Sequence, residues 1–210
     1  MRLLILGGTG KTGNALITQA LDAGHHVTVF GRSPLNGFET RSNLKSLVGN
    51  PMRPQELDAV TPDHDAVLSV LGTRGLGPTT VLVDGAGSAI AAMHAGKVKR
   101  LVILSSSLVD LEAGFFTGIA SRTLFRHTAN DQKKMEKLVT GSDLEWTIFR
   151  PARTTNGALT RHAEVITGNE PGKSNSRAVS RQDVAQRMLE AVESRNYVRQ
   201  TVWLRGSASQ

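Results

Sequence analysis

Three glycines at intervals of three residues stand near the start of the chain. They follow the apolar run at residues 3–6 and precede a segment with helical spacing, so the sequence predicts a strand, a tight turn and a helix. Gly7 lets the chain turn off the strand, Gly10 lets backbone N–H groups approach an anion, and Gly13 lets the helix pack close to the sheet. The start of such a helix attracts anions through its free N–H groups and its dipole. The pattern predicts a binding loop for the pyrophosphate of a dinucleotide, formed by Gly7, Thr9, Gly10, Lys11, Thr12 and Gly13.

The end of this loop, Gly10-Lys11-Thr12, also matches the end of the phosphate loop of nucleotide triphosphatases. That longer loop requires a glycine five positions before Gly10, and Ile5 stands there instead. Because Ile5 belongs to the apolar run, the loop is too short to surround a β-phosphate. The sequence therefore favours a dinucleotide over a nucleoside triphosphate.

The end of the second apolar run indicates which dinucleotide is bound. An acidic residue at this place would bind the ribose hydroxyls of NAD, but the run at residues 27–30 continues into Gly31, Arg32 and Ser33. A guanidinium forms paired hydrogen bonds with a phosphate, and Ser33 adds another donor. We therefore expect NADP to be preferred, with Arg32 and Ser33 at its 2′-phosphate. The alternative is a solvated surface arginine.

Short runs rich in valine, isoleucine and leucine alternate along the chain with segments of helical spacing. We expect strands in residues 3–6, 27–30, 44–48, 66–71, 101–104 and 147–149, and helices in residues 13–23, 79–95, 130–140 and 183–192. Continuous hydrophobicity in such runs is typical of parallel strands that are buried on both faces. The sequence predicts an α/β fold, a doubly wound parallel sheet of the NAD(P)-binding Rossmann type. We expect one domain over residues 1–205 and a flexible tail at 206–210.

Two segments interrupt this alternation, at residues 109–127 and 156–180. Both follow expected strand ends, where ligands of open parallel sheets bind, so we expect them to form walls of a substrate site. The alternative for residues 156–180 is a surface hairpin. Ser180 and Asp183, three positions apart, are typical of a capping pair that begins a helix.

Composition excludes several classes of protein. The absence of cysteine excludes disulfides, thiolate catalysis and sulfur-ligated metals, and the six histidines lack ligand spacing, so we expect no metal. Lys and Arg outnumber Asp and Glu by 25 to 18, but they are scattered and only 4% of the residues are aromatic. We therefore expect no nucleic acid as a partner.

No apolar run approaches the ~18 residues of a membrane span, so we expect a cytoplasmic protein that does not bind a membrane.

Two common catalytic arrangements are missing from the sequence. Short-chain dehydrogenases use a tyrosine with a lysine four positions later, whereas the single tyrosine, Tyr197, is followed at that spacing by Thr201. No Gly-x-Ser-x-Gly elbow of an α/β-hydrolase is present. Ordinary alcohol or ketone chemistry is therefore disfavoured.

Several segments together resemble a known family. They are the glycine loop, residues 27–29 leading to Arg32, Asp65-Ala66-Val67, Leu71-Gly72-Thr73-Arg74, Pro78-Thr79-Thr80-Val81 and Leu144-Glu145-Trp146-Thr147. The chain resembles the atypical short-chain dehydrogenase/reductase superfamily, and within it the NAD(P)H-binding, NmrA-like group that includes biliverdin-IXβ reductase, also called flavin reductase. This resemblance implies an NADPH-dependent reductase whose acceptors are flavins and, in some members, linear tetrapyrroles.

The resemblance also implies roles for individual residues. Ser106 matches a serine that assists the substrate, and Arg153 stands where biliverdin reductase has a histidine. Because an arginine cannot exchange protons near neutral pH, reduction of a tetrapyrrole is in doubt, while neutralisation of an acceptor's charge remains possible. Asn50 replaces an aspartate that relatives carry near the adenine, with little expected effect. The other positions implied at the cofactor are Leu71, Gly72, Thr73, Arg74, Ser105, Pro151 and Ala152.

The sequence thus predicts an NADPH-dependent oxidoreductase that transfers hydride to a small aromatic acceptor, a flavin or a quinone-like molecule. Ser106 would orient the acceptor or the carboxamide, and Arg153 would neutralise developing charge. One alternative is a non-catalytic redox sensor, as in NmrA-like regulators. Another is an epimerase or dehydratase of nucleotide sugars, which the missing Tyr/Lys pair disfavours.

Overall fold

A single mostly parallel sheet organises the protein. The computed structural model describes residues 1–38, 40–73, 75–107, 109, 119–168 and 177–207. Its main sheet has eight strands in the order β3-β2-β1-β4-β5-β6-β10-β8, and all neighbours are parallel except β10 and β8. The bounds are β1 Arg2–Leu6, β2 His26–Gly31, β3 Leu44–Val48, β4 Ala66–Ser69, β5 Arg100–Leu104, β6 Glu145–Pro151, β8 Glu164–Thr167 and β10 Gln200–Arg205. Strand order reverses between β1 and β4, where such sheets bind ligands at their carboxyl edge.

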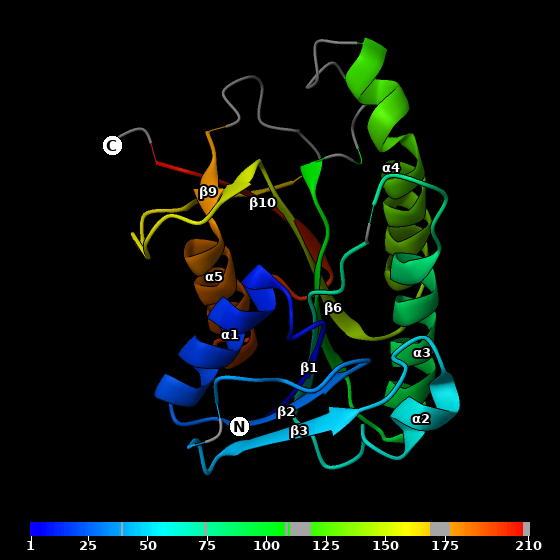
Figure 1. The fold of residues 1–210 in the computed structure, drawn as a ribbon, viewed down its shortest axis with the longest axis vertical. Helices are drawn as coiled ribbons and strands as arrows, with labels where there is room; N and C mark the ends of the chain where they lie inside the picture. Colours follow the sequence, from blue (N-terminus) through cyan, green and yellow to red (C-terminus); the bar gives the residue numbers. More distant parts are fainter. Residues whose placement is uncertain (39, 74, 108, 110–118, 169–176, 208–210) are drawn as a thin grey trace.

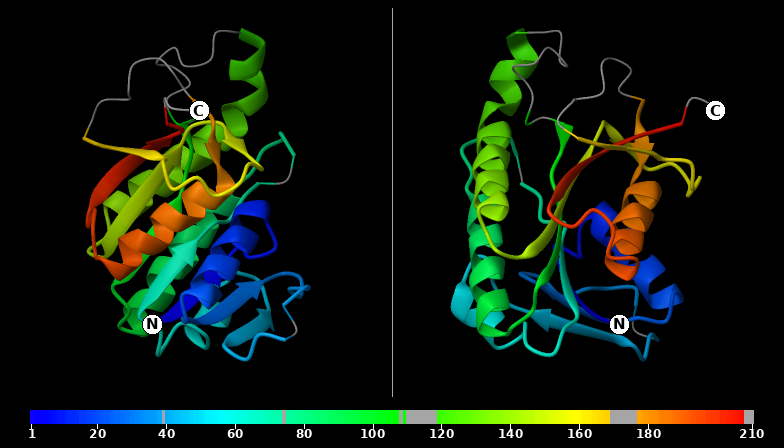
Figure 2. Two further views of the ribbon diagram at one scale, coloured as in Figure 1. Left: turned by 90° about the vertical axis from the view of Figure 1, so that its left-hand side faces the viewer. Right: turned by 180° about the vertical axis from the view of Figure 1, so that it is seen from behind.

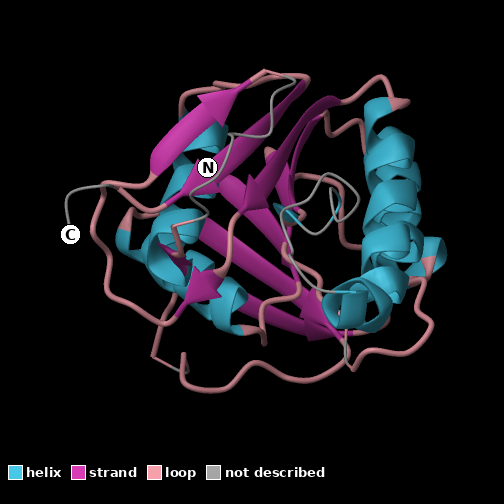
Figure 3. Ribbon diagram, turned by 90° about the horizontal axis from the view of Figure 1, so that it is seen from above, coloured by secondary structure: helices cyan, strands magenta, loops and turns pink. Residues whose placement is uncertain are grey.

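Helices cover both faces of this sheet (Figure 1). Helices α1 and α5 pack together on one face, and α3 and α4 pack together on the other (Figures 2 and 3). The bounds are α1 Lys11–Asp22, α2 Pro54–Asp58, α3 Val81–Ala95, α4 Ile119–Thr140 and α5 Arg181–Glu193. This single-domain α/β arrangement confirms the predicted fold class.

Strand β1 shows why its sequence lacks the polar alternation of a half-exposed strand. Leu3 and Ile5 belong to the core under α1 and α5, whereas Leu4 and Leu6 belong to the core under α3 and α4. All four side chains are fully buried. Since burial of one such side chain is worth roughly 1.5–3 kcal/mol, both faces of the strand need apolar residues.

The six expected strands and four expected helices are present, but the structure adds elements that the sequence pattern did not indicate. Strand β10 has only three consecutive apolar residues, and β8 joins the sheet as its antiparallel edge. Helix α2 is a single short turn. A second small sheet pairs β7, Thr154–Thr155, with β9, Val179–Ser180. These short elements are stabilised by pairing with remote strands, which local periodicity does not reveal.

Helix α4 corrects one expectation about residues 109–127. We expected this whole segment to interrupt the alternation, but α4 begins at Ile119 rather than near residue 130. Its first turns extend beyond the sheet (Figures 1 and 2), and Leu124 there is 48% exposed. Because this part of the helix covers no strand, it lacks the apolar stripe by which a helix is recognised in a sequence.

The tail predicted at residues 206–210 begins with Gly206, which is hydrogen-bonded to the domain. The Gly206 N–H donates to the Arg177 carbonyl at 3.1 Å, and Arg177 Nε donates to the Gly206 carbonyl at 2.8 Å. Residues 208–210 lie outside the described part of the chain.

The expected capping pair at the start of α5 is confirmed. Ser180 Oγ accepts from the Asp183 N–H at 3.0 Å and donates to Asp183 Oδ2 at 2.7 Å. Asp183 also accepts from the backbone N–H groups of Thr160 and Arg161, both at 2.8 Å. Burial of the Asp183 carboxyl raises its pKa, but the hydrogen bonds from Ser180, Arg161 and Thr160 outweigh burial and lower the pKa below its ordinary value. One carboxylate thus joins the loop after β7 to α5.

We expect Asp183→Asn to lower the free energy of unfolding by roughly 1.5–3 kcal/mol near neutral pH, because hydrogen bonds to a charged group have this strength. A lowered pKa means that ionised Asp183 stabilises the fold fully above about pH 4, and this stabilisation is lost as pH falls through the folded-state pKa. Urea unfolding across this pH range measures the difference. The exposed Asp58 provides a control. Two results would contradict this role of Asp183. One is an equal loss of unfolding free energy in Asp58→Asn and Asp183→Asn, and the other is a difference between wild type and Asp183→Asn that does not shrink in acid.

Candidate functional site

A cavity of about 600 Å³ lies at the carboxyl ends of the strands, within the size range of small-molecule sites. Its wall is formed by the loop between β1 and α1, by the segments after β2, β4 and β5, and by residues of α4 and α5. Of the residues expected at the site, those lining it are Gly7, Thr9, Gly10, Lys11, Thr12, Gly13, Arg32, Ser33, Leu71, Gly72, Thr73, Ser105 and Ser106. The fold therefore brings most of the predicted residues together.

The three glycines of the loop meet different requirements. Gly7 has a φ of +88°, which favours glycine, and a Cβ there would stand 2.6 Å from the Val70 carbonyl oxygen. A Cβ on Gly13 would stand 2.4 Å from the Gly7 carbonyl oxygen. Gly10 has an ordinary φ of −78°, and its Cβ would meet only the Gly7 oxygen at 3.5 Å. The fold thus requires Gly7 and Gly13, whereas Gly10 leaves open space at the cavity.

Positive charge surrounds this open space. Gly10 precedes α1 without a side-chain cap, and the first turn of α1 contains no acidic residue. Its first N–H groups therefore remain available to an anion. Within the described part of the chain, the side chains of Lys11 and Arg32 have neither a hydrogen bond nor an ion pair. These features fit the phosphate groups of a dinucleotide.

The opposite wall is polar. Ser106 Oγ donates to Gln132 Oε1 at 2.9 Å, and the hydroxyls of Thr73 and Thr128 are 3.5 Å apart. Ser105 is 5% exposed, and its Oγ has no partner in the described structure. An unpartnered buried hydroxyl is costly, so a ligand group that hydrogen-bonds to Ser105 would remove this cost.

Four polar side chains that line the cavity were not predicted from the sequence, namely Thr128, Gln132, Thr154 and Arg181. Thr128 and Gln132 lie one turn apart on α4, at the spacing that dehydrogenases use for tyrosine and lysine. This four-residue spacing could have indicated both positions, although they carry threonine and glutamine instead of tyrosine and lysine. Thr154 and Arg181 are brought to the cavity by the pairing of β7 with β9, which the sequence did not predict.

Several expected site residues do not line the cavity. Asn50 Oδ1 accepts from the Met52 N–H at 3.1 Å and shapes its own turn. Pro151 is buried in β6, the Ala152 N–H donates to Leu204 at 2.8 Å, and the Arg153 side chain is exposed. Arg74 lies outside the described residues. The roles expected of these residues stay predictions.

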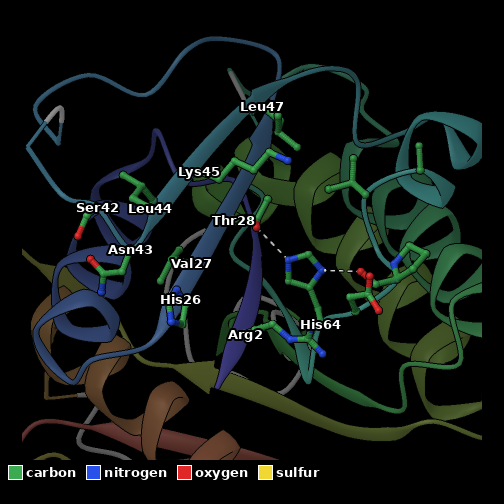
Figure 4. Close-up of a pocket in the computed structure, with 14 residues that line it drawn as sticks. Arg2, His26, Val27, Thr28, Ser42, Asn43, Leu44, Lys45, Leu47 and His64 are labelled. Carbon is green, nitrogen blue, oxygen red and sulfur yellow. Dashed lines mark hydrogen bonds between the residues drawn. The ribbon is translucent and has the colours of Figure 1, made fainter.

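A second cavity, of about 410 Å³, lies at the amino ends of β1, β2 and β3 (Figure 4). Basic and acidic side chains lie together in its wall, among them Lys45 and Asp63. His64 is engaged on both ring nitrogens, by Thr28 Oγ1 at 2.9 Å and by the Thr61 carbonyl at 3.2 Å. The glycine loop lies at the other edge of the sheet, so the carboxyl-edge cavity is the candidate site.

Comparison with known proteins agrees with this geometry. A model of the NAD(P)H-binding family matches residues 7–195, from the first loop glycine to beyond α5. The chain belongs to the NAD(P)H-binding family. Three features of the cavity fit the NAD(P)H that this family binds. They are the glycine loop, the cation Arg32 after β2 and the Ser105 hydroxyl, which has no partner in the described structure.

Individual relatives differ in their described roles. The Photosystem II assembly factor Ycf39 of Synechocystis is 28% identical over 216 residues, which cover 99% of this chain and 63% of that protein. The chain thus spans less than two thirds of the length of that relative, and 51% of the Ycf39 of Trieres chinensis. A Rossmann-fold NAD(P)-binding family protein from Shigella flexneri is 25% identical with a TM-score of 0.76, covering 100% of this chain and 95% of the other.

The solved structure of ChuY, an anaerobillin reductase from Escherichia coli O157:H7, has a TM-score of 0.83 at 18% identity. The match covers 100% of this chain and 99% of ChuY. This likeness shows the shared fold.

The described residues hold neither a membrane-spanning helix nor a cluster of metal ligands. None of their helices combines the length and the apolar composition that crossing a membrane requires. No group of three or more His, Asp or Glu side chains in this part of the chain is arranged to hold a metal ion.

The loop geometry predicts that Gly10→Val will fold normally and lose the dinucleotide. Its Cβ meets no backbone closer than 3.5 Å, but the added methyl groups would occupy the space beside the α1 N-terminus. We expect NADPH binding to weaken roughly 100-fold or more, because several charge-assisted hydrogen bonds are lost. Calorimetry measures binding, and thermal unfolding checks the fold.

Gly87→Ala is the matched control, because a Cβ there makes an ordinary 3.5 Å contact with Leu138, away from the cavity. This variant is expected to bind NADPH as the wild type does. Normal NADPH binding by a folded Gly10→Val would show that the loop is no phosphate site.

Proposed function

We propose that this protein is an NADPH-dependent oxidoreductase that transfers hydride to a flavin or quinone-like aromatic acceptor. The observation that carries the proposal is one cavity with two dissimilar ends. The glycine loop and Arg32 lie at one end, and the hydroxyls of Ser106 and Thr128 lie at the other. A dinucleotide held at the cationic end leaves the polar wall available for a second ligand.

NADPH is favoured as the hydride donor by the residues after β2. Arg32 and Ser33 both line the cavity and are exposed, and Arg32 has no partner among the described residues. A 2′-phosphate would satisfy the guanidinium, whereas the two hydroxyls of the NAD ribose would be better matched by a carboxylate. NADPH supplies a hydride at C4 of its nicotinamide when bound.

The chain's own residues would align the acceptor and stabilise its charge. Ser106, which is positioned by its hydrogen bond to Gln132, would orient the carboxamide or the acceptor. Addition of hydride to a flavin or quinone leaves negative charge on the ring until a proton arrives from water. A cationic cavity without a phenol favours this type of acceptor, because Tyr197 packs against Phe149 and does not line the site.

A second candidate function is a dinucleotide-dependent assembly or regulatory protein. The similarity to Ycf39, a Photosystem II assembly factor, favours it. In that case dinucleotide binding would alter a partner interaction, and the cavity would not need a second ligand. Steady-state oxidation of NADPH with FMN, riboflavin or a quinone discriminates the two, because turnover requires an acceptor site. Tight binding of NADPH without turnover with any acceptor would favour the regulatory function.

The cofactor assignment predicts an asymmetric effect of Arg32→Ala. Loss of a charge-assisted phosphate contact should weaken NADPH binding by roughly 1.5–3 kcal/mol and leave NADH binding almost unchanged. Calorimetric titration with both cofactors measures this difference. Exposed Arg53 supplies a control, since it pairs with Glu56 and does not line the cavity. Equal losses for NADPH and NADH in Arg32→Ala would remove the argument for a 2′-phosphate site.

A further inference from the structure

The cavity wall has a one-sided charge distribution. Among the described residues that line it, Lys11, Arg32 and Arg181 are cationic, and none is an aspartate or a glutamate. Lys11 and Arg32 are accounted for by the phosphate groups of the dinucleotide. Arg181 is a third cation that the dinucleotide assignment leaves without a role.

The strand order separates Arg181 from Arg32. Arg32 follows β2 and Thr154 follows β6, and these strands are four steps apart in the sheet. At ~4.8 Å per step, their ends are about 19 Å apart. Arg181 is the first residue of α5, which packs against α1 and also contacts β5 and β6. The pairing of Thr155 with Ser180 places Arg181 beside the segment that follows β6, and it lines the cavity together with Thr154. Arg181 therefore lies toward the β5 and β6 end, where Ser106 is also found.

The guanidinium of Arg181 is held but not neutralised. Its Nη1 donates to Asn156 Oδ1 at 2.7 Å, and within the described residues this amide is its one hydrogen-bond partner. An arginine carries five N–H donors, so most of them stay available to a ligand. The side chain is half-buried, which weakens competition from water and salt relative to a fully exposed charge.

We propose that Arg181 binds the anionic side group of the acceptor and thereby sets its class. The preferred acceptor is a planar molecule that carries a phosphate or a carboxylate, rather than a neutral ring. This inference rests on the proposed function and refines it. It also assigns to Arg181 the charge recognition that sequence resemblance assigned to Arg153, whose side chain is exposed and outside the cavity wall.

Two pairs of acceptors that differ in charge test the proposal. FMN and riboflavin differ by the phosphate, and biliverdin and its dimethyl ester differ by the carboxylates. We consider whichever pair of acceptors the protein reduces. In Arg181→Gln we expect the KM for its charged member to rise roughly 5-fold to 150-fold, with little change for its neutral member. Arg181→Lys should restore part of this loss, because it keeps the charge but not the fork of donors. Added salt should reduce the preference of the wild type for the charged acceptor.

Arg126→Gln is the matched control, because Arg126 is an exposed arginine of α4 that does not line the cavity. Thermal unfolding of each variant checks the fold, and NADPH affinity should be retained in all of them. Equal effects on charged and neutral acceptors in Arg181→Gln would overturn the inference. Loss of NADPH binding in that variant would do the same, as would a charge-selective effect found in Arg153→Gln instead.

A binding measurement separates this inference from the proposed function. Quenching of FMN and riboflavin fluorescence is followed with wild type and Arg181→Gln, each saturated with NADP⁺. Absence of turnover with every acceptor would count against the proposed function, whereas weaker FMN binding in Arg181→Gln would still uphold the role of Arg181. Turnover that persists without any loss of charge selectivity would uphold the function and reject Arg181.

Discussion

The contact between the start of α1 and the loop before it constrains the rest of the structure. A Cβ on Gly13 would stand 2.4 Å from the Gly7 carbonyl oxygen. The helix therefore approaches the loop more closely than any residue other than glycine would allow at position 13. This approach fixes the first turn of α1 at the carboxyl edge of the sheet, beside the end of β4. The free N–H groups of the helix and the strand-order reversal between β1 and β4 therefore coincide at one place.

The opposite wall depends on polar contacts between elements. The Asp131 carboxylate of α4 accepts from the backbone N–H groups of Leu82 and Val83, at 3.0 and 3.1 Å, and so caps α3 from a neighbouring helix. Five residues further along α4, Glu136 forms a largely buried ion pair with Arg150 of β6. These two contacts lie on either side of Gln132, which holds Ser106. Removal of Arg150 would take this partner from the buried Glu136 carboxylate, so the ion pair favours one arrangement of the wall.

The two ends of the cavity suit different parts of a reaction. At one end, backbone N–H groups and the cations Lys11 and Arg32 are suited to phosphate, and binding there requires no proton exchange. At the other end, hydroxyl and amide groups lie with Arg181 and are suited to orienting a planar ligand that carries a negative charge. A hydride-transfer enzyme needs alignment and charge stabilisation more than it needs an acid or a nucleophile, and this cavity offers the former two.

The alternation of strands and helices, the parallel sheet and the glycine loop were all predictable from the residue pattern. These features depend on local periodicity and on residues within a few positions of each other, such as Gly7 and Gly13. The Ser180–Asp183 cap was predictable for the same reason, because its partners are three residues apart.

The residues that complete the cavity depend on contacts between segments far apart in the chain. Arg153 is the second residue after β6, yet its side chain is exposed. Arg181 instead reaches the wall from α5 through the pairing of β7 with β9. Likewise, β10 and β8 are strands because they pair with segments far away in the chain. A side chain's direction at a strand end depends on such long-range pairing, and no local pattern of residue types encodes it.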